Sequence, residues 1–260
     1  MNHEPRHERV VSVIAQKIFS GALRPGDKLP TERDLAREMD LDRTSLRTAL
    51  KRLESLRVIE IRPGDGIYVL DYTKNAGLDF LRLIFEQEKT EAGQPFVIDD
   101  FTIYEVWEFW ASFFPSMLRF AAKRVSPRDI KFMLDLMEEE KRNLNDRDRV
   151  VELNILQEDL VAEATHNLVF KLSANASRPI RKKMVDYFVR SVDTPTLAMH
   201  VDLKQAFLSQ YLSGDMGLDG LAEKYEAVLA AHLEALRKRH AGKDVAAMVE
   251  EYKTALNAGI

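Results

Sequence analysis

Cationic and hydroxyl side chains gather at the start of one amphipathic segment, which begins at Asp42. On a helical wheel, this segment separates an apolar face from a basic face. The apolar face consists of Leu46, Ala49, Leu50 and Leu53, and the basic face of Arg43, Thr44, Arg47 and Lys51. Arginine can donate two hydrogen bonds to guanine O6 and N7, and hydroxyl groups can reach bases or phosphates. The segment therefore carries the side chains of a DNA-binding helix, although a basic face is also common on an ordinary surface helix.

Two helices are predicted before this segment and a hairpin after it. Helical periodicity covers residues 5–21, and Thr31 and Asp34, at capping-box spacing, begin a second helix that ends near residue 39. Beyond the basic segment, two β-branched runs flank a glycine-rich turn and predict a hairpin over residues 58–70. Three helices followed by a hairpin are the order of a winged helix-turn-helix.

This order brings the candidate DNA contacts together. A recognition helix enters the major groove with its N-terminal end, and a wing can lie against the phosphates or the minor groove. The candidate contacts therefore lie at the start of the recognition helix, on the helix before it and on the wing. They are Arg43, Thr44, Ser45, Arg47, Arg33 and Arg62.

Four separated motifs within residues 29–69 carry a family resemblance. They read Pro30-Thr31-Glu32-Arg33-Asp34-Leu35, Asp42-Arg43-Thr44-Ser45-Leu46-Arg47, Leu50-Lys51-Arg52-Leu53-Glu54 and Gly64-Asp65-Gly66-Ile67-Tyr68-Val69. At this spacing they resemble the DNA-binding domain of the GntR family of bacterial regulators. The resemblance implies base or phosphate contacts from three arginines, hydroxyl contacts from two side chains and a glycine wing tip. By position these are Arg33, Arg43, Arg47, Thr44, Ser45 and Gly64. The family usually has Gly or Ser near position 40, where this chain has Asp40.

From about residue 76 onward the chain shows helical periodicity and no convincing strand. Breaks at proline and glycine divide it into segments over residues 76–88, 102–124, 127–143, 147–165, 167–191, 197–212, 217–240 and 242–258. Pro115 falls inside one of them, so that helix is expected to be kinked or divided there. The sequence thus predicts a mainly α protein with a winged helix-turn-helix over residues 1–72 and an all-α helical bundle over residues 76–260.

The helical part resembles the FadR-like subfamily, whose C-terminal helices form an effector pocket and help the protein to dimerise. Short stretches that begin at Gly77, Ala164 and Asp186 are more like its acyl-CoA-sensing member than like its organic-acid sensors. Aromatic residues are enriched along 102–124, which suits an apolar ligand cavity or simply a large core. They are Tyr104, Trp107, Trp110, Phe113 and Phe114. Arg178, Arg181, Lys182 and Lys183 could meet coenzyme A phosphates or form a solvated helix face.

Many organic-acid sensors of this subfamily bind a divalent metal through one Asp and three His. By position, these ligands fall on Asn154, Glu158, His232 and Ala255, so only His232 keeps the ligand type of the subfamily. An Asn-Glu-His set is a poor site for zinc or nickel, and a core histidine bonded to a carboxylate is the other interpretation. No cofactor is therefore expected. Tyr104, Trp107, Asn154, Glu158 and His232 are the candidate effector contacts, and a metal-dependent organic-acid sensor is the alternative. His200 is expected to be a surface or capping residue.

Composition narrows the remaining classes of function. The 260 residues include no Cys, which removes disulfides and thiol nucleophiles, and no nucleophile-base set or phosphate-binding glycine loop points to an enzyme. No apolar run reaches the ~18 residues of a membrane span, so a cytoplasmic protein is expected. The sequence predicts a homodimeric regulator that binds an inverted-repeat double-stranded DNA operator and responds to a small molecule, such as acyl-CoA or a fatty-acid-like ligand.

Overall fold

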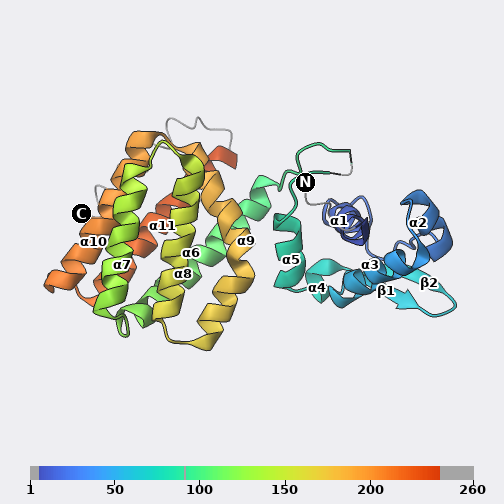
Figure 1. Ribbon diagram of the computed structural model, residues 1–260, viewed down its shortest axis with the longest axis horizontal. Coiled ribbons are helices and arrows are strands. Elements are labelled where there is room, and N and C mark those ends of the chain that lie inside the picture. Colours follow the sequence, from blue (N-terminus) through green and yellow to red (C-terminus); the bar gives the residue numbers. More distant parts are fainter. Residues whose placement is uncertain (1–5, 91, 241–260) are drawn as a thin grey trace. The chain divides into compact units, whose positions relative to one another are not determined.

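The computed structural model describes residues 6–90 and 92–240, without the side chains of Arg6, Leu218, His232 and residues 235–240. The described residues form eleven helices and one two-stranded sheet, which confirms the mainly α class (Figure 1). The chain divides into two compact units, Met1–Val97 and Ile98–Ile260. The helix predicted over residues 242–258 lies outside the described residues.

Three helices form the main part of the first unit. They are α1 (Arg6–Phe19), α2 (Glu32–Glu38) and α3 (Arg43–Ser55). Helix α3 packs against α1 and α2, and all four residues of its predicted apolar face are buried. Asp40 adopts a left-handed backbone with φ of 51° and ends α2 in a Schellman turn, in which the Leu41 amide donates to Ala36 O at 2.9 Å. Aspartate therefore fills a position that favours glycine, and the turn between α2 and α3 stays short.

The wing consists of β1 (Ile59–Arg62) and β2 (Gly66–Val69), which pair antiparallel with Arg62 opposite Gly66. The Asp65 amide donates to Arg62 O at 3.0 Å, and Gly64 has φ of 76°. A proline followed by a residue with positive φ is typical of a type II turn, so Pro63-Gly64 defines the tip. The segment around Lys28 also pairs with β2, since the Leu29 amide donates to Ile67 O at 2.8 Å. The sequence pattern does not predict this third partner.

The first unit extends to Val97, beyond residue 72, where the sequence predicted the DNA-binding domain to end. The sequence pattern assigns residues 76–88 to the helical domain, whereas α5 (Leu78–Phe85) packs against α1 after the short α4 (Tyr72–Asn75). Its inward face, which includes Phe80 and Ile84, is buried there. The boundary differs because periodicity identifies a helix but not the core that receives its apolar face.

Six helices form the second unit. They are α6 (Asp100–Ala122), α7 (Pro127–Arg142), α8 (Arg147–Ala164), α9 (Leu168–Ser191), α10 (Thr194–Ser213) and α11 (Leu218–His240). Helix α6 contacts α8, α9 and α11, so it forms the centre of this unit. It is unbroken across Pro115, which is buried, and the predicted division at this residue is wrong. Proline removes one hydrogen bond from a helix, and α6 keeps its other contacts with three neighbouring helices.

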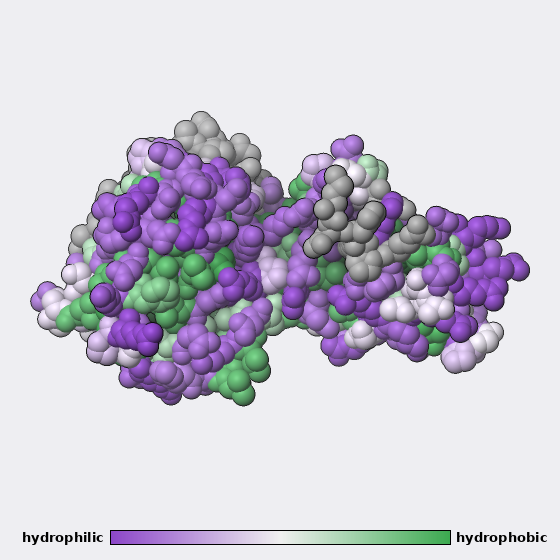
Figure 2. All heavy atoms as spheres, in the orientation of Figure 1, coloured by the Kyte–Doolittle hydropathy of each residue, from purple (hydrophilic) through white to green (hydrophobic). Residues whose placement is uncertain are grey.

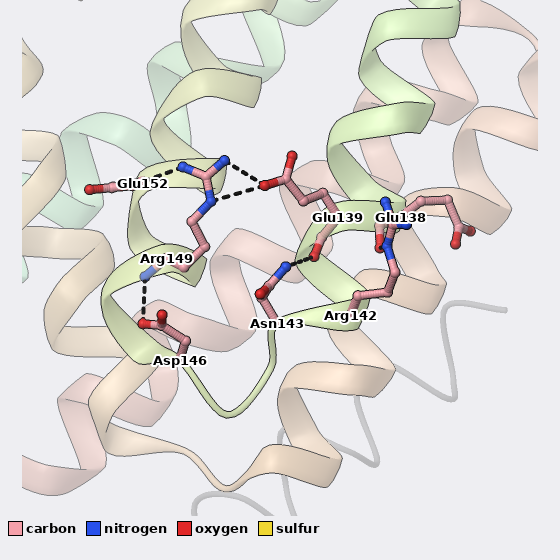
Figure 3. Close-up of polar contacts among 7 residues, drawn as sticks. All are labelled: Glu138, Glu139, Arg142, Asn143, Asp146, Arg149 and Glu152. Carbon is pink, nitrogen blue, oxygen red and sulfur yellow. Dashed lines mark hydrogen bonds and ion pairs between the residues drawn. The ribbon is translucent and has the colours of Figure 1, made fainter.

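A surface ion pair joins α7 to α8 (Figure 3). Arg149 donates through Nε and Nη2 to Oε1 of Glu139 at 3.0 and 2.5 Å, and through Nη1 to Glu152 at 2.9 Å. Asp146 caps α8 by accepting the Arg149 amide at 3.1 Å. These contacts lie at the surface and stabilise the short loop between α7 and α8.

Candidate nucleic-acid interface and ligand cavity

Asp42 fixes the start of α3. Its Oδ1 accepts the amides of Thr44 and Ser45, each at 2.9 Å, and its Oδ2 accepts the Ser45 hydroxyl at 2.6 Å. The hydroxyl and these amides lower the pKa of Asp42 below its ordinary value, because they stabilise the ionised carboxylate. The cap therefore stays charged at neutral pH and sets the direction in which the next side chains leave the helix.

The three predicted arginines project into solvent. Arg43 is exposed at the first position of α3, and the side chains of Arg33 and Arg47 are 81% and 70% exposed. Arg47 Nε donates to Glu32 Oε2 at 2.9 Å, which is a surface pair between α3 and α2. Such exposed pairs contribute only ~0–1 kcal/mol, so a phosphate or base can replace Glu32. None of these three arginines is locked into the interior of the unit.

The two predicted hydroxyl contacts differ in their surroundings. Thr44 is exposed beside Arg43. Ser45 is half-buried, and its hydroxyl already donates a hydrogen bond to the Asp42 carboxylate. Ser45 can accept a hydrogen bond as it stands, but it must leave the cap to donate one to a phosphate. Thr44 is thus the more accessible of the two.

The wing holds its cations over an aromatic ring. The guanidinium of Arg62 lies 4.4 Å from the centre of the Tyr68 ring and pairs with Glu60 at 2.8 Å. Lys28 lies over the same ring at 5.4 Å and reaches Asp65 at 3.5 Å. Lys28 was missed by sequence reasoning because its place beside the wing depends on the pairing of its segment with β2. Gly64 lies at the exposed tip with open space where a side chain would be.

The second unit encloses a cavity of about 130 Å³ to which all six helices contribute. Its apolar wall includes Trp107, Trp110 and Phe114 of α6, and its polar wall includes Asn154, Glu158, Gln157, His200 and Lys204. Three of the five predicted effector contacts, namely Trp107, Asn154 and Glu158, therefore line this cavity. Tyr104 is half-buried and lies outside its lining, and the side chain of His232 lies outside the described residues. Phe113 also lies outside the lining.

A buried polar cluster lies beside this cavity. Lys204 Nζ donates to Glu140 Oε2 at 2.6 Å, to Gln157 Oε1 at 2.9 Å and to Asn154 Oδ1 at 3.2 Å. The amides of Asn154 and Gln157 donate to the Glu140 carboxylate at 2.9 and 2.7 Å. Lys204 and Glu140 are 8% and 1% exposed. The cluster closes on itself, since each charged group has its partner inside it.

The possible metal ligands have cationic partners of the protein's own. Asn154 accepts from Lys204, and Glu158 accepts from Arg181 Nη1 at 2.6 Å. Within residues 6–90 and the described side chains of 92–240, no group of three or more His, Asp or Glu is placed to hold a metal ion. Among the described side chains, Asn154 and Glu158 do not fit a divalent cation, because a lysine ammonium already donates to the first and an arginine guanidinium already pairs with the second.

Two expectations about basic residues are corrected here. Arg181 is 1% exposed and donates to Glu158 and Asp159, each at 2.6 Å, so it is neither on a solvated face nor free to meet phosphates. Burial alone would lower the pKa of Arg181, but the two carboxylates outweigh it and raise this pKa. His200, expected at the surface or in a cap, lines the cavity. Burial and the nearby Lys204 charge hold the pKa of His200 well below its ordinary value, so it is neutral at pH 7.

Helices long and apolar enough to cross a bilayer do not occur in the described part of the chain. Residues 6–69 match the profile of the family described as "Bacterial regulatory proteins, gntR family". The chain is 31% identical to an uncharacterized HTH-type transcriptional regulator of Mycobacterium bovis, Mb0601, over 74% of this chain and 71% of that protein. It is also 31% identical to the Uxu operon transcriptional regulator of Escherichia coli, over 62% of this chain and 59% of the regulator.

A solved structure shows the same fold at low sequence identity. It is that of Lar, which controls the expression of the Listeria monocytogenes agr system. The match covers 92% of this chain and 99% of Lar, with a TM-score of 0.59 and 15% identity. The profile match covers the winged helix-turn-helix, and the Mycobacterium relative extends the similarity into the helical unit. The chain therefore belongs to the GntR family of DNA-binding transcriptional regulators.

Proposed function

We propose that this regulator binds an inverted-repeat operator as a homodimer and that a small molecule in the helical unit changes its operator affinity. The observation that carries the proposal is the group of exposed cations at the start of α3, next to a wing that carries Arg62. The FadR-like subfamily is the part of the family that this helical unit resembles. The proposal has three parts, which concern the DNA contacts, the dimer and the effector.

The DNA contacts divide into two groups. Arg43, Thr44 and Arg47 read base edges, because they leave the first two turns of α3, the part of a recognition helix that enters the major groove. Arg33, Ser45, Arg62 and Gly64 position the protein on the sugar-phosphate backbone, which fixes register but carries no sequence information. The exposure of Arg33 and Arg47 and the open space around the wing tip support the access of both groups to DNA.

The dimer presents two recognition helices to two half-sites of one duplex. An apolar surface on α6 and α9 supports association of the helical units, and Figure 2 shows hydrophobic residues at the surface where α9 begins. Its exposed members include Phe109, Phe120, Leu168, Val169 and Leu172. The rings of Phe109 and Phe113 stack at 5.5 Å, and Phe113 reaches Phe170 at the same distance. Contiguous exposed apolar surface of this kind marks interaction sites.

The effector is an apolar small molecule held in the cavity of the helical unit. A fatty-acid-like chain, such as the acyl group of an acyl-CoA, is the form that the aromatic wall supports. Its binding must favour one arrangement of the two DNA-binding units, because only a difference in affinity between two states shifts their equilibrium.

Selection from a random DNA library by the full-length protein tests the DNA part. We expect enrichment of one short inverted repeat, with binding by a dimer in sedimentation measurements. A control selection with Arg43→Ala should enrich sequences in which one position of each half-site is less defined. Enrichment of no sequence, or of a single asymmetric half-site by a monomer, would contradict the proposal.

A further inference from the structure

Among the described side chains, the cavity of the helical unit offers no free charge to a ligand. Lys204 and Glu158 are the only lysine, arginine, aspartate or glutamate among its described lining residues. Burial raises the pKa of Glu158 above its ordinary value, although Arg181 opposes this shift. An ammonium has three N–H donors, and all three donors of Lys204 have acceptors within 3.2 Å inside the protein. Glu158 has its counter-ion in Arg181, at 2.6 Å. Each charge in the wall is therefore neutralised before any ligand arrives.

The remaining wall is aromatic or neutral. Trp107 and Phe188 meet edge to face with ring centres 6.3 Å apart, and Trp110 and Phe114 lie 5.6 Å apart. His200 adds a neutral imidazole, because burial and Lys204 lower its pKa. A ligand that carried a charge into this wall would lose its hydration and find no unpaired counter-ion, and that loss is large for an ionised group.

We propose that the group that enters this cavity is an uncharged, mainly apolar molecule or chain end, and that the Glu140–Lys204 pair is what excludes carboxylates. This inference rests on the proposed role of the cavity as the effector site. Glu140 is decisive, because it neutralises the one cation of the described lining that could otherwise attract an acid. Buried at 1% exposure, it accepts from Lys204, Asn154 and Gln157 at once.

The cavity size limits the probes. A cavity of about 130 Å³ is close to the ~150 Å³ engineered cavity that binds benzene, so six-carbon compounds suit it. Hexanol, hexanoate and hexylamine have the same chain and differ in charge. Hexylamine is included because aromatic faces attract cations.

Both tryptophans of the chain line the cavity, so their emission reports its occupancy directly. We expect hexanol to shift the emission of the full-length protein, and to bind at least about tenfold more tightly than hexanoate or hexylamine, which is about 1.4 kcal/mol. Hexanoate or hexylamine binding as tightly as hexanol would overturn the inference. If none of the three probes binds, the cavity is no ligand site and the inference falls, whereas operator selection remains a separate test of DNA binding.

Glu140→Gln tests the exclusion itself, because it leaves the Lys204 charge without its counter-ion. We expect the preference for hexanol over hexanoate to fall at least tenfold or to reverse. Glu139→Gln is the matched control, since Glu139 is the adjacent residue of α7 but pairs with Arg149 at the surface (Figure 3). It should keep the wild-type preference. An unchanged preference in folded Glu140→Gln would overturn the inference.

A second variant keeps the test decisive if Glu140→Gln does not fold. Glu140→Gln/Lys204→Met removes both charges of the pair and leaves Glu158, which pairs with Arg181, as the acidic side chain of the described lining. It should still bind hexanol in preference to hexanoate, and a preference for hexanoate would contradict the exclusion.

Discussion

Cationic side chains have opposite surroundings in the two units. In the first unit, the Arg33 and Arg47 side chains are 81% and 70% exposed, and Arg43 is exposed at the helix start. In the second unit, Arg181 is 1% exposed and bonded to two carboxylates. This contrast indicates that a cation can bind an external polyanion such as DNA only if the protein leaves its side chain accessible. A cation with buried internal partners instead fixes the positions of the helices that carry them.

Arg181→Met should have the largest effect. It leaves Glu158 and Asp159 without their buried cation, and removal of one partner from a buried ion pair costs about 3–5 kcal/mol of stability. Urea unfolding followed by tryptophan emission measures it, because both tryptophans lie on α6 of the second unit. Arg178→Met is the control, since Arg178 pairs with the same Asp159 at 2.8 Å but is 52% exposed. Equal losses in the two variants would remove the distinction between buried and exposed cations.

Arg43→Ala should weaken operator binding by about 1–3 kcal/mol and reduce discrimination at one base pair of each half-site. Fluorescence anisotropy with the selected operator and with a scrambled duplex separates the two effects. Arg52→Ala is the control, because Arg52 lies on the same helix and reaches Glu8 of α1 at 3.5 Å instead of facing outward with Arg43. Equal weakening of Arg43→Ala on both duplexes would refute a base-reading role for Arg43.

Arg62→Ala should weaken binding to operator and scrambled DNA alike. A wing cation that contacts phosphate contributes to affinity without sequence preference, and its loss should lower the slope of log affinity against log salt by about 1. Titrations at several salt concentrations measure this slope. A selective loss on the operator would instead place Arg62 among the base-reading residues.

Glu32→Gln should have the smallest effect. It removes the surface partner of Arg47, so the unfolding free energy should fall by no more than about 1 kcal/mol. DNA affinity should rise slightly, because Arg47 is released and one negative charge near the duplex is lost. Thermal unfolding and anisotropy measure both changes, and a fall in DNA affinity would indicate that Glu32 positions Arg47 for its contact.

Sequence reasoning predicted most of the first unit because its signals are local. The Asp42 cap, the leucine spacing of α3 and the Pro63-Gly64 turn each depend on residues a few positions apart, and the structure contains all three. The pairing of the Lys28 segment with β2 and the packing of α5 on α1 were missed. Both depend on contacts between distant segments, which a pattern in one segment does not encode.

In the second unit, the sequence predicted the helices but not the partners of their polar residues. Arg181 stands among Arg178, Lys182 and Lys183, a pattern typical of a solvated face, yet it is buried because α8 supplies two carboxylates to it. Lys204 and Glu140 lie on different helices, and neither stands out in its own segment. Aromatic enrichment did indicate a cavity wall, since Trp107, Trp110 and Phe114 line it.

The Asp42 carboxylate has a consequence for how the protein searches along a genome. The amides at a helix start can bind a phosphate, because they have no partner within the helix. Here the Asp42 carboxylate already accepts the amides of Thr44 and Ser45. A phosphate of the duplex therefore finds the Thr44 and Ser45 amides already occupied, and contacts at this end of α3 must come from side chains. The backbone amides of the helix start thus add little affinity for unrelated DNA.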